Sequence, residues 1–269
     1  MATQPAPEAG GTGKAGLPLF YRDPQPLSSS AHADWRLKSG DASFAAEAAY
    51  VPIVAAELTA AARCYPVVFA AGDAQLVAVL GLQRRNLFVK DGQWSLDCYV
   101  PAYVRRYPFG FIATGKPDEF VLAVDAASER IERSGGEGTP LFEDGKPAEL
   151  TRQALAFCDA FQSDARATRA FAEALKAEDL LIDRRVDATL PDGRKLGLEG
   201  FQIVDRERFA RLPDEAVKEW HGNGYLAWVH FHLASLDRFS SLLDRQARAD
   251  ASEAAPEPVH EPKPKKVPA

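Results

Sequence analysis

Four pairs of short apolar runs lie along the chain, and each pair is separated by residues typical of tight turns. Gly72-Asp73 and Asp91-Gly92 separate the first two pairs, and residues 115–118 and 191–193 separate the last two. Runs of this length joined by such turns predict β-hairpins, and Asp-Gly is the strongest of these signals. The paired runs are residues 66–71 and 75–82, 86–90 and 93–98, 109–114 and 120–125, and 181–190 and 195–204.

Other segments show the three- and four-residue apolar spacing of helices. A helix is predicted from about Pro52, which suits a first turn, through Ala62, and it must end before Pro66. Residues 148–177 carry one long apolar stripe, which predicts a helix in the middle of the chain. A short helix is predicted after Pro213 and a final amphipathic helix over residues 235–247. Residues 225–233 fit either a strand or the start of a buried helix.

These elements predict an α+β fold, because the strands come in hairpins and do not alternate with helices. We expect a largely antiparallel sheet built from hairpins, a helical middle segment and a C-terminal helix. Residues 17–248 are expected to form a single domain. Residues 1–16, rich in Ala, Gly and Pro, and residues 249–269, rich in Pro and charge, are expected to be disordered tails.

The composition limits which kinds of partner and which cellular compartment are expected for this protein. The 269 residues are 46% hydrophobic and carry a net charge of −6, which argues against nucleic acid as the main partner. No apolar stretch reaches the roughly 18 residues of a membrane span, so no integral membrane segment is expected. The first 16 residues lack the apolar core of a signal peptide, and three cysteines without a Cys-x-x-Cys pair fit a reducing compartment. Together they predict a cytoplasmic protein.

The densest group of aromatic and cationic residues consists of Tyr99, Tyr103, Arg105, Arg106 and Tyr107. Planar guanidinium groups suit carboxylate or phosphate, and aromatic rings supply a rigid apolar wall. These five residues are therefore the predicted ligand-binding site, for a peptide carboxyl terminus or a small acidic molecule. The alternative is structural, with the tyrosines packed in the core. Since adjacent arginines point in different directions, one is expected to pair with an internal carboxylate and the other to face solvent or ligand.

Two other groups contain residue types that are found in metal sites or in catalytic triads. His230 and His232 share a face if their segment is a strand, but a metal ion would need a third ligand from elsewhere, such as His221, Asp205 or His32. Ser28-Ser29-Ser30 with His32 and Asp34 contains the residue types of a catalytic triad, yet no Gly-x-Ser-x-Gly elbow is present. Structural roles are favoured for both groups, so no metal, cofactor or catalytic residue is predicted.

Much of the chain resembles one protein family. The most distinctive stretch is Tyr-Val-Pro-Ala-Tyr-Val-Arg-Arg-Tyr-Pro-Phe at residues 99–109, preceded by Tyr-Pro-Val-Val-Phe at 65–69 and Asn-Leu-Phe-Val at 86–89. Further matching segments are Pro-Leu-Phe-Tyr at 18–21, Gly-Phe at 200–201 and His-Leu at 232–233. In these segments the chain resembles the SapC family, over almost all of residues 17–243.

The resemblance implies a cellular role for the protein, but it does not imply a reaction mechanism. The family takes its name from a bacterial surface-layer locus and is associated with S-layer protein transport, and its members tend to occur beside TonB-dependent receptors and halogenase-like proteins. It implies no catalytic residue. The leading hypothesis is a non-catalytic binding or accessory protein, whose partner is a protein or a small acidic or peptide ligand. The alternatives are an enzyme acting on such a ligand and a scaffold for a partner enzyme.

Overall fold

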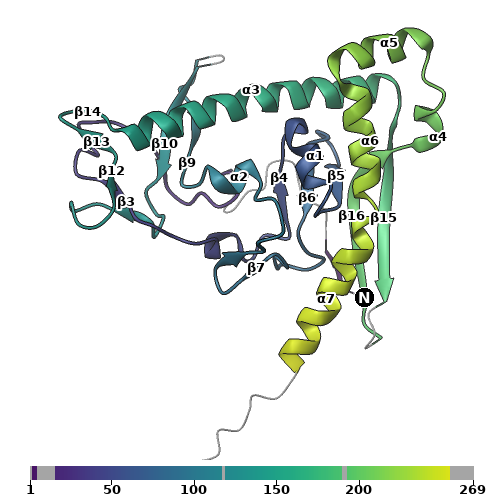
Figure 1. Ribbon diagram of the computed structural model, residues 1–269, viewed down its shortest axis with the longest axis horizontal. Helices are drawn as coiled ribbons and strands as arrows, with labels where there is room; N and C mark the ends of the chain where they lie inside the picture. The colour runs from purple at the N-terminus through teal and green to yellow at the C-terminus, as the bar shows by residue number, and fades with distance from the viewer. Residues whose placement is uncertain (1, 5–15, 117–118, 190–192, 255–269) are drawn as a thin grey trace, which may run out of the picture.

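The computed structural model describes residues 2–4, 16–116, 119–189 and 193–254 (Figure 1). Within them, the largest sheet has six strands in the order β1-β16-β5-β6-β4, with β15 also paired to β16. Its strands are β1 (Ala2–Gln4), β4 (Tyr50–Pro52), β5 (Val67–Ala70), β6 (Leu76–Val79), β15 (Leu181–Thr189) and β16 (Lys195–Val204). Only β1 joins this sheet in parallel, so the fold is α+β and largely antiparallel, as the sequence predicts.

All four predicted hairpins are present: β5–β6, β15–β16, β7 (Val89–Lys90) with β8 (Gln93–Trp94), and β9 (Phe109–Ala113) with β10 (Phe120–Asp125). Asp91 and Gly92 both have positive φ, at 49° and 74°, as the Asp-Gly signal requires. The β7–β8 hairpin is shorter than predicted. Residues 117–118 and 190–192, in the last two predicted turns, lie outside the described residues.

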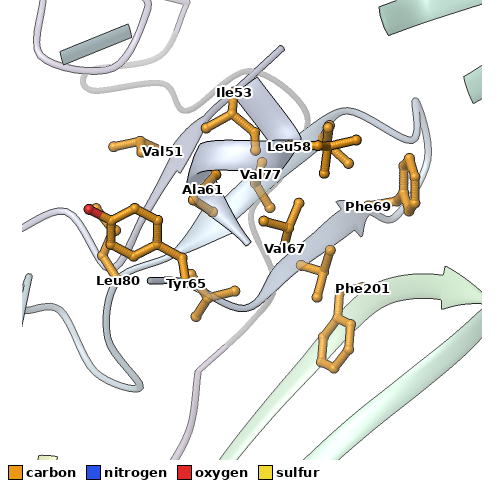
Figure 2. Close-up of a cluster of buried hydrophobic side chains, with 14 of the residues drawn as sticks. Val51, Ile53, Leu58, Ala61, Tyr65, Val67, Phe69, Val77, Leu80 and Phe201 are labelled. Atoms are coloured by element: carbon orange, nitrogen blue, oxygen red, sulfur yellow. The ribbon is translucent and has the colours of Figure 1, made fainter. Parts of the chain in front are cut away.

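The main hydrophobic core packs around the central strands (Figure 2). Leu58, Tyr65, Phe69 and Leu76 are each 0% exposed, and β5 and β6 are buried at every position. Strands buried on both faces read as continuous apolar runs, which is why this hairpin is visible in the sequence. Replacing one such leucine by alanine costs about 2–5 kcal/mol, so this cluster is the main source of stability.

A second, smaller core lies under the three-stranded sheet β2-β10-β9, where β2 is Pro24–Pro26. Its buried members are Phe109, Val124, Ile131, Leu141, Phe142 and Cys158. Short strands border it: β3 (Arg36–Leu37), β11 (Ile131–Glu132), β12 (Thr139–Pro140), β13 (Phe142–Glu143) and β14 (Lys146–Pro147). The described part of the chain therefore contains two hydrophobic clusters.

The predicted central helix is α3 (Glu149–Ala177), which runs along one side of the molecule above α1 (Leu58–Ala61) and α2 (Ala102–Arg105) (Figure 1). Its Cys158 belongs to the smaller cluster, whereas its Phe171 and Leu175 belong to the main core. One helix thus contributes to both clusters.

The helix predicted from Pro52 begins later than expected. Tyr50–Pro52 instead form β4, paired with Val77–Val79 of β6, and Val54 is still extended, with φ −104° and ψ 154°. Helical structure starts with the 3₁₀ helix η2 (Ala55–Glu57) and continues as α1. The local spacing is correct from Leu58 onward, but pairing with a strand distant in sequence keeps the first residues extended. A second 3₁₀ helix, η1 (Ser43–Ala45), precedes β4.

The C-terminal part of the chain is helical. α5 (Asp214–Asn223) begins after Pro213 as predicted, and Gly224 in a left-handed conformation separates it from α6 (Tyr225–Ser235). The structure thereby selects helix over strand for residues 225–233. α7 (Arg238–Ala254) follows and continues past the predicted boundary at Arg248.

Most of both predicted tails lies outside the described residues. Of residues 1–16 the structure describes β1 and Gly16, and of residues 249–269 it describes the end of α7. No helix in the described part of the chain combines the length and the apolar character needed to cross a bilayer.

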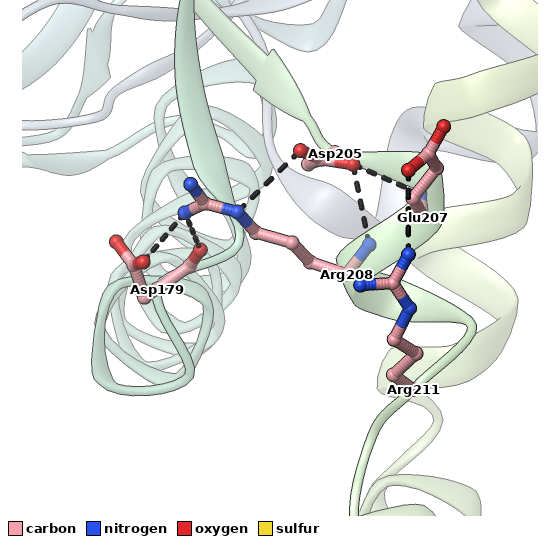
Figure 3. A network of polar contacts seen from close by, with 5 residues as sticks. All are labelled: Asp179, Asp205, Glu207, Arg208 and Arg211. Carbon is pink, nitrogen blue, oxygen red and sulfur yellow. Dashed lines mark hydrogen bonds and ion pairs between the residues drawn. The ribbon is translucent and has the colours of Figure 1, made fainter.

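A polar network fixes the short helix α4 (Arg206–Phe209) (Figure 3). Asp205 caps it, since its Oδ1 accepts from the backbone N–H groups of Glu207 at 2.9 Å and Arg208 at 3.2 Å. The Arg208 guanidinium donates to the backbone oxygen of Asp179 at 2.7 Å and also lies 3.5 Å from the Asp205 carboxylate. Arg211 pairs with Glu207 one turn away. The network connects α4 to the turn that follows α3.

The edge strand β15 is mostly charged on its exposed positions. Asp183, Arg184, Arg185 and Asp187 are exposed, and Arg185 pairs with Asp187 at 2.8 Å and with Glu199 of β16 at 2.7 Å. This pattern matches a strand that packs on one side and meets solvent along the other.

Candidate functional site

The five predicted site residues lie on and around the short helix α2, but they do not share one environment. Tyr103 and Tyr107 are buried, at 6% and 3% exposure, Tyr99 and Arg106 are half-buried, and Arg105 is exposed. A helical turn separates neighbours by about 100°. The segment therefore sends some side chains into the core and others outward.

The buried carboxylate of Glu57 holds the start of α2. Its Oε1 accepts from the backbone N–H of Ala102 at 2.7 Å and from the Tyr99 hydroxyl at 2.9 Å, and its Oε2 accepts from the N–H of Val54 at 2.9 Å. Burial raises the pKa of Glu57, and these three hydrogen bonds and the charge of Arg105 act in the opposite direction. Glu57 is a site-organising residue that the sequence pattern gives no reason to select.

Arg105 extends this chain of contacts to the surface. Its Nη2 donates to the Tyr99 hydroxyl at 2.9 Å and its Nε donates to the backbone oxygen of Val100 at 3.1 Å. The guanidinium carbon also lies 5.1 Å from the ring centroid of Phe157 on α3. Arg105 is therefore the outward arginine, held in place while still in contact with solvent.

Arg106 is the inward arginine, but its partner differs from the prediction. The sequence predicts an internal carboxylate, whereas the guanidinium carbon lies 4.1 Å from the Tyr103 ring centroid, 4.5 Å from Phe161 and 5.8 Å from Tyr21. Aromatic faces attract a cation electrostatically and so take the place of the carboxylate. Its Nε is buried and has no hydrogen-bond partner. The guanidinium of Arg106 is thus positioned without being neutralised.

Tyr107 has a structural role in this arrangement. Its hydroxyl donates to Asp125 Oδ2 at 2.8 Å and its ring stacks on Phe44 at 4.3 Å between centroids. Burial, with a further contribution from Asp125, raises the pKa of Tyr107 to about 12. The hydroxyl therefore remains protonated and already bonded, and what Tyr107 offers the site is its backbone carbonyl oxygen.

That carbonyl oxygen accepts from Nη1 of Arg130 at 3.1 Å, and Arg130 is a site residue that sequence reasoning misses. The aliphatic stem of Arg130 packs on Gly40, where an added Cβ would come within 2.6 Å of the arginine Cδ. Its Nε is also buried and without a hydrogen-bond partner. Burial lowers the pKa of Arg130, while the nearby Tyr107 and Asp41 raise it.

These side chains meet at a pocket of about 300 Å³ between α2, α3 and the loop carrying Arg130, which we call the arginine pocket. Three arginines line it, and among the described residues that do so there is no carboxylate. Its lining is Leu37, Arg105, Arg106, Tyr107, Phe109, Arg130, Leu150, Gln153, Ala154, Phe157 and Cys158. Of the five predicted residues, the structure brings Arg105, Arg106 and Tyr107 to this pocket, and places Tyr99 and Tyr103 beside it as supports.

A larger hollow of about 600 Å³ shares Tyr107 and Arg130 with the arginine pocket. Its lining adds the cations Arg22 and Lys38, but also the carboxylates Asp41 and Glu129. Because these two carboxylates offset most of the charge of its three cations, it has a weaker electrostatic preference for an anion than the smaller pocket. We therefore take the arginine pocket as the candidate site.

The other constellations seen in the sequence do not assemble. His230 and His232 lie on a helix, where His230 is exposed and His232 is buried with its Nε2 accepting from the backbone N–H of Val204 at 3.1 Å. The Ser28 hydroxyl pairs with that of Ser30, and His32 accepts from the Ser28 backbone instead. No three His, Cys, Asp or Glu side chains within the described ranges gather as a metal site.

The fold and the site together define an α+β protein with a cationic pocket between a short helix and a long one. The SapC family model matches residues 27–242, which is most of the chain and includes every residue that lines the pocket; the chain belongs to the SapC family. No curated protein and no solved structure matches it significantly.

Proposed function

We propose that this protein is a non-catalytic binding protein for a small anionic ligand, a carboxylic acid or the carboxyl terminus of a peptide, held in the arginine pocket. The observation that carries the proposal is that Arg105, Arg106 and Arg130 all line this pocket, while no carboxylate is among the described residues that do so. A ligand carboxylate supplies the negative charge that a lining of this kind favours.

The charge of the pocket supports the same ligand class. Three guanidinium groups repel one another in a partly buried site, and burial alone lowers the pKa of Arg130. A bound anion offsets both costs, because it supplies opposite charge where solvent is scarce. The planar guanidinium matches the two oxygens of a carboxylate.

Binding is favoured over catalysis by the ionisable groups near the pocket. Burial raises the pKa of Cys158 to about 11 and that of Tyr107 to about 12. A general acid or base works best with a pKa near the operating pH. These groups remain protonated at neutral pH, so they suit a binding wall better than proton transfer.

Calorimetric titration with benzoate, succinate and inorganic phosphate tests the proposal. We expect Arg130→Gln and Arg106→Gln each to weaken binding about tenfold or more, since hydrogen bonds to charged groups contribute about 1.5–3 kcal/mol. Arg166→Gln, at an exposed position of α3 away from the pocket, is the matched control and should bind like the parent protein. Absence of binding to all three probes, or undiminished binding by both pocket variants, would contradict the proposal.

We place this binding in an accessory role beside surface-protein transport or TonB-dependent uptake, as the family resemblance implies, and in the cytoplasm. All three cysteines, Cys64, Cys98 and Cys158, are free thiols, which suits a reducing compartment. Cell fractionation of the producing organism tests the compartment. Mass spectrometry of small molecules and proteins that co-purify tests the role.

A further inference from the structure

A second hollow of about 460 Å³ lies next to the arginine pocket, and we call it the apolar hollow. Arg106 lines both cavities, and Tyr103 and Phe161, whose rings flank its guanidinium, line the second one. Its lining is Pro52, Ile53, Val54, Asp73, Ala74, Gln75, Leu76, Tyr103, Arg106, Phe161, Ala165, Thr168, Arg169, Ala172, Glu173 and Lys176. Arg106 therefore lies where the two cavities meet.

Both cavities follow the same face of α3. The helix contributes Leu150, Gln153, Ala154, Phe157 and Cys158 to the first cavity, and then Phe161, Ala165, Thr168, Ala172 and Lys176, among others, to the second. These positions recur three and four residues apart, which places them on one side of a helix. At 1.5 Å per residue, Ala154 and Thr168, which lie near the middle of each lining, are about 21 Å apart. Together the cavities form a track along α3.

The floor of the apolar hollow is suited to hydrocarbon. Ile53, Val54, Leu76 and Ala172 are buried at 3%, 2%, 0% and 3% exposure. The hydroxyl of Thr168 already accepts from the N–H of Ala55 at 2.8 Å, and its proton is donated to the backbone oxygen of Asp164 at 2.7 Å. The floor therefore offers few free polar groups to a ligand.

Two charged groups at the far end of the track, Lys176 and Glu173, are paired with each other. Lys176 Nζ donates to Glu173 Oε1 at 3.0 Å and to the backbone oxygen of Asp73 at 3.3 Å. An ion pair of this kind leaves little net attraction for a second ligand charge. The track is thus cationic at one end, apolar in the middle and internally balanced at the other.

We infer that the ligand is an elongated amphipathic monocarboxylate, whose carboxylate lies among Arg105, Arg106 and Arg130 and whose apolar body extends into the hollow beside Ala165. This inference rests on the proposed function and adds the chemical class of the ligand. A free aliphatic or aromatic acid and the apolar carboxyl terminus of a peptide share this chemistry, and the experiment separates them.

The first measurement is the affinity of straight-chain monocarboxylates from two to ten carbons. Each methylene that enters the hollow should tighten binding about fourfold, since burying one CH₂ contributes about 0.8 kcal/mol. Affinity that stays constant with chain length while acetate and phosphate still bind would overturn this inference and leave the proposed function intact. Failure of every anion to bind would overturn both.

The second measurement uses variants of α3. Ala165→Phe fills the apolar hollow and should abolish the dependence on chain length while acetate binds as before, which also shows that the variant is folded. Ala167→Phe, at an exposed position of the same helix outside both linings, is the matched control and should keep the full dependence. An unchanged dependence in Ala165→Phe would overturn the assignment of the hollow.

The third measurement compares decanoate with an N-acetylated Leu-Leu-Leu tripeptide and its C-terminal amide. Tighter binding of the free tripeptide than of decanoate identifies a peptide terminus, and the reverse order identifies a free acid. Both results support an amphipathic monocarboxylate as the ligand. Equal binding of the amide and the free tripeptide would overturn it, because the amide carries no carboxylate.

Discussion

Two buried ionisable side chains, Glu57 and His232, hold separate parts of the protein through the hydrogen bonds that they accept. Glu57 joins the loop before α1 to the start of α2, and His232 joins α6 to the end of β16. Glu57 is 6% exposed and His232 is 0% exposed. A buried acceptor that satisfies backbone N–H groups cannot be removed without leaving those groups unpaired.

The protonation of His232 should make stability depend on pH. Burial lowers the pKa of His232 to about 4, from an ordinary value of 6.5. Above pH 6.5 the histidine is neutral in both the folded and the unfolded chain; between pH 6.5 and 4 only the unfolded chain takes up the proton. The free energy of unfolding should therefore fall as the pH drops through this window, by about 3 kcal/mol at pH 4.

Urea unfolding at a series of pH values measures this effect. His232→Gln should flatten the curve between pH 6.5 and 4, whereas His230→Gln, on the same helix but exposed, should keep it. If the two variants show the same pH dependence as the parent protein, the buried histidine is not its source.

Loss of the Glu57 carboxylate should weaken both the fold and the site. Glu57→Ala leaves the N–H groups of Val54 and Ala102 and the Tyr99 hydroxyl without their acceptor, and should lower the free energy of unfolding by about 3 kcal/mol. Because Tyr99 in turn orients Arg105, anion binding should weaken as well. Glu47→Ala, at an exposed position, should change neither property. Thermal melting of both variants measures the change in stability, and calorimetric titration measures the change in anion affinity. A fully stable Glu57→Ala protein would contradict the role of Glu57 as a buried acceptor.

At the scale of elements, the end of α7 is held by contacts that composition does not reveal. Leu242 and Gln246 are buried at 1% and 0% exposure. Gln246 donates to Asp250 at 2.8 Å, and Arg194, next to the β15–β16 turn, pairs with the same carboxylate. These contacts explain why the helix passes the boundary predicted at Arg248.

Two truncated proteins test the contribution of this last part of α7. A chain ending at Ala254 should be more stable than one ending at Arg248, by about 1 kcal/mol, because only the longer chain keeps Asp250 and its contacts with Gln246 and Arg194. Thermal melting of the pair isolates residues 249–254. Identical melting temperatures would mean that the end of α7 adds nothing to the fold.

The elements that could be predicted are those whose signals are local. The Asp91-Gly92 turn fixes its hairpin by positive φ angles, and the stripe of α3 fixes a helix by spacing alone. β4 could not be predicted, because Tyr50–Pro52 are extended only through pairing with Val77–Val79. Local sequence specifies turns and periodicity, whereas strand pairing depends on residues far along the chain.

At the scale of the whole molecule, the candidate site was also only partly predictable, because it depends on residues far apart along the chain. Arg105 and Arg106 stand out because they are adjacent and lie among tyrosines, and both line the arginine pocket. Arg130 and Gln153 reach it from other parts of the chain, and Glu57 supports it from a third. A pocket assembled from segments this far apart has no signature in any one of them, and the aromatic surroundings of Arg106 arise only in the folded protein.

The two hydrophobic clusters should unfold together, because α3 belongs to both. Trp35 packs against the smaller cluster, and Trp94 is a buried member of the main core. In urea, tryptophan fluorescence and far-UV circular dichroism should give one shared midpoint in the parent protein, and again one shared midpoint in Trp35→Phe. Midpoints from the two probes that differ within either protein would show that the clusters are independent units.

The charged edge of β15 bears on how copies of this protein behave at high concentration. An edge strand presents unpaired backbone donors and acceptors, to which a strand from another molecule can add and start aggregation. Parallel, in-register addition of a second β15 would place Arg184, Arg185 and the two neighbouring aspartates each opposite the same residue, with loss of water from each charge. The exposed charges of β15 therefore disfavour extension of the largest sheet into a neighbouring molecule at this edge.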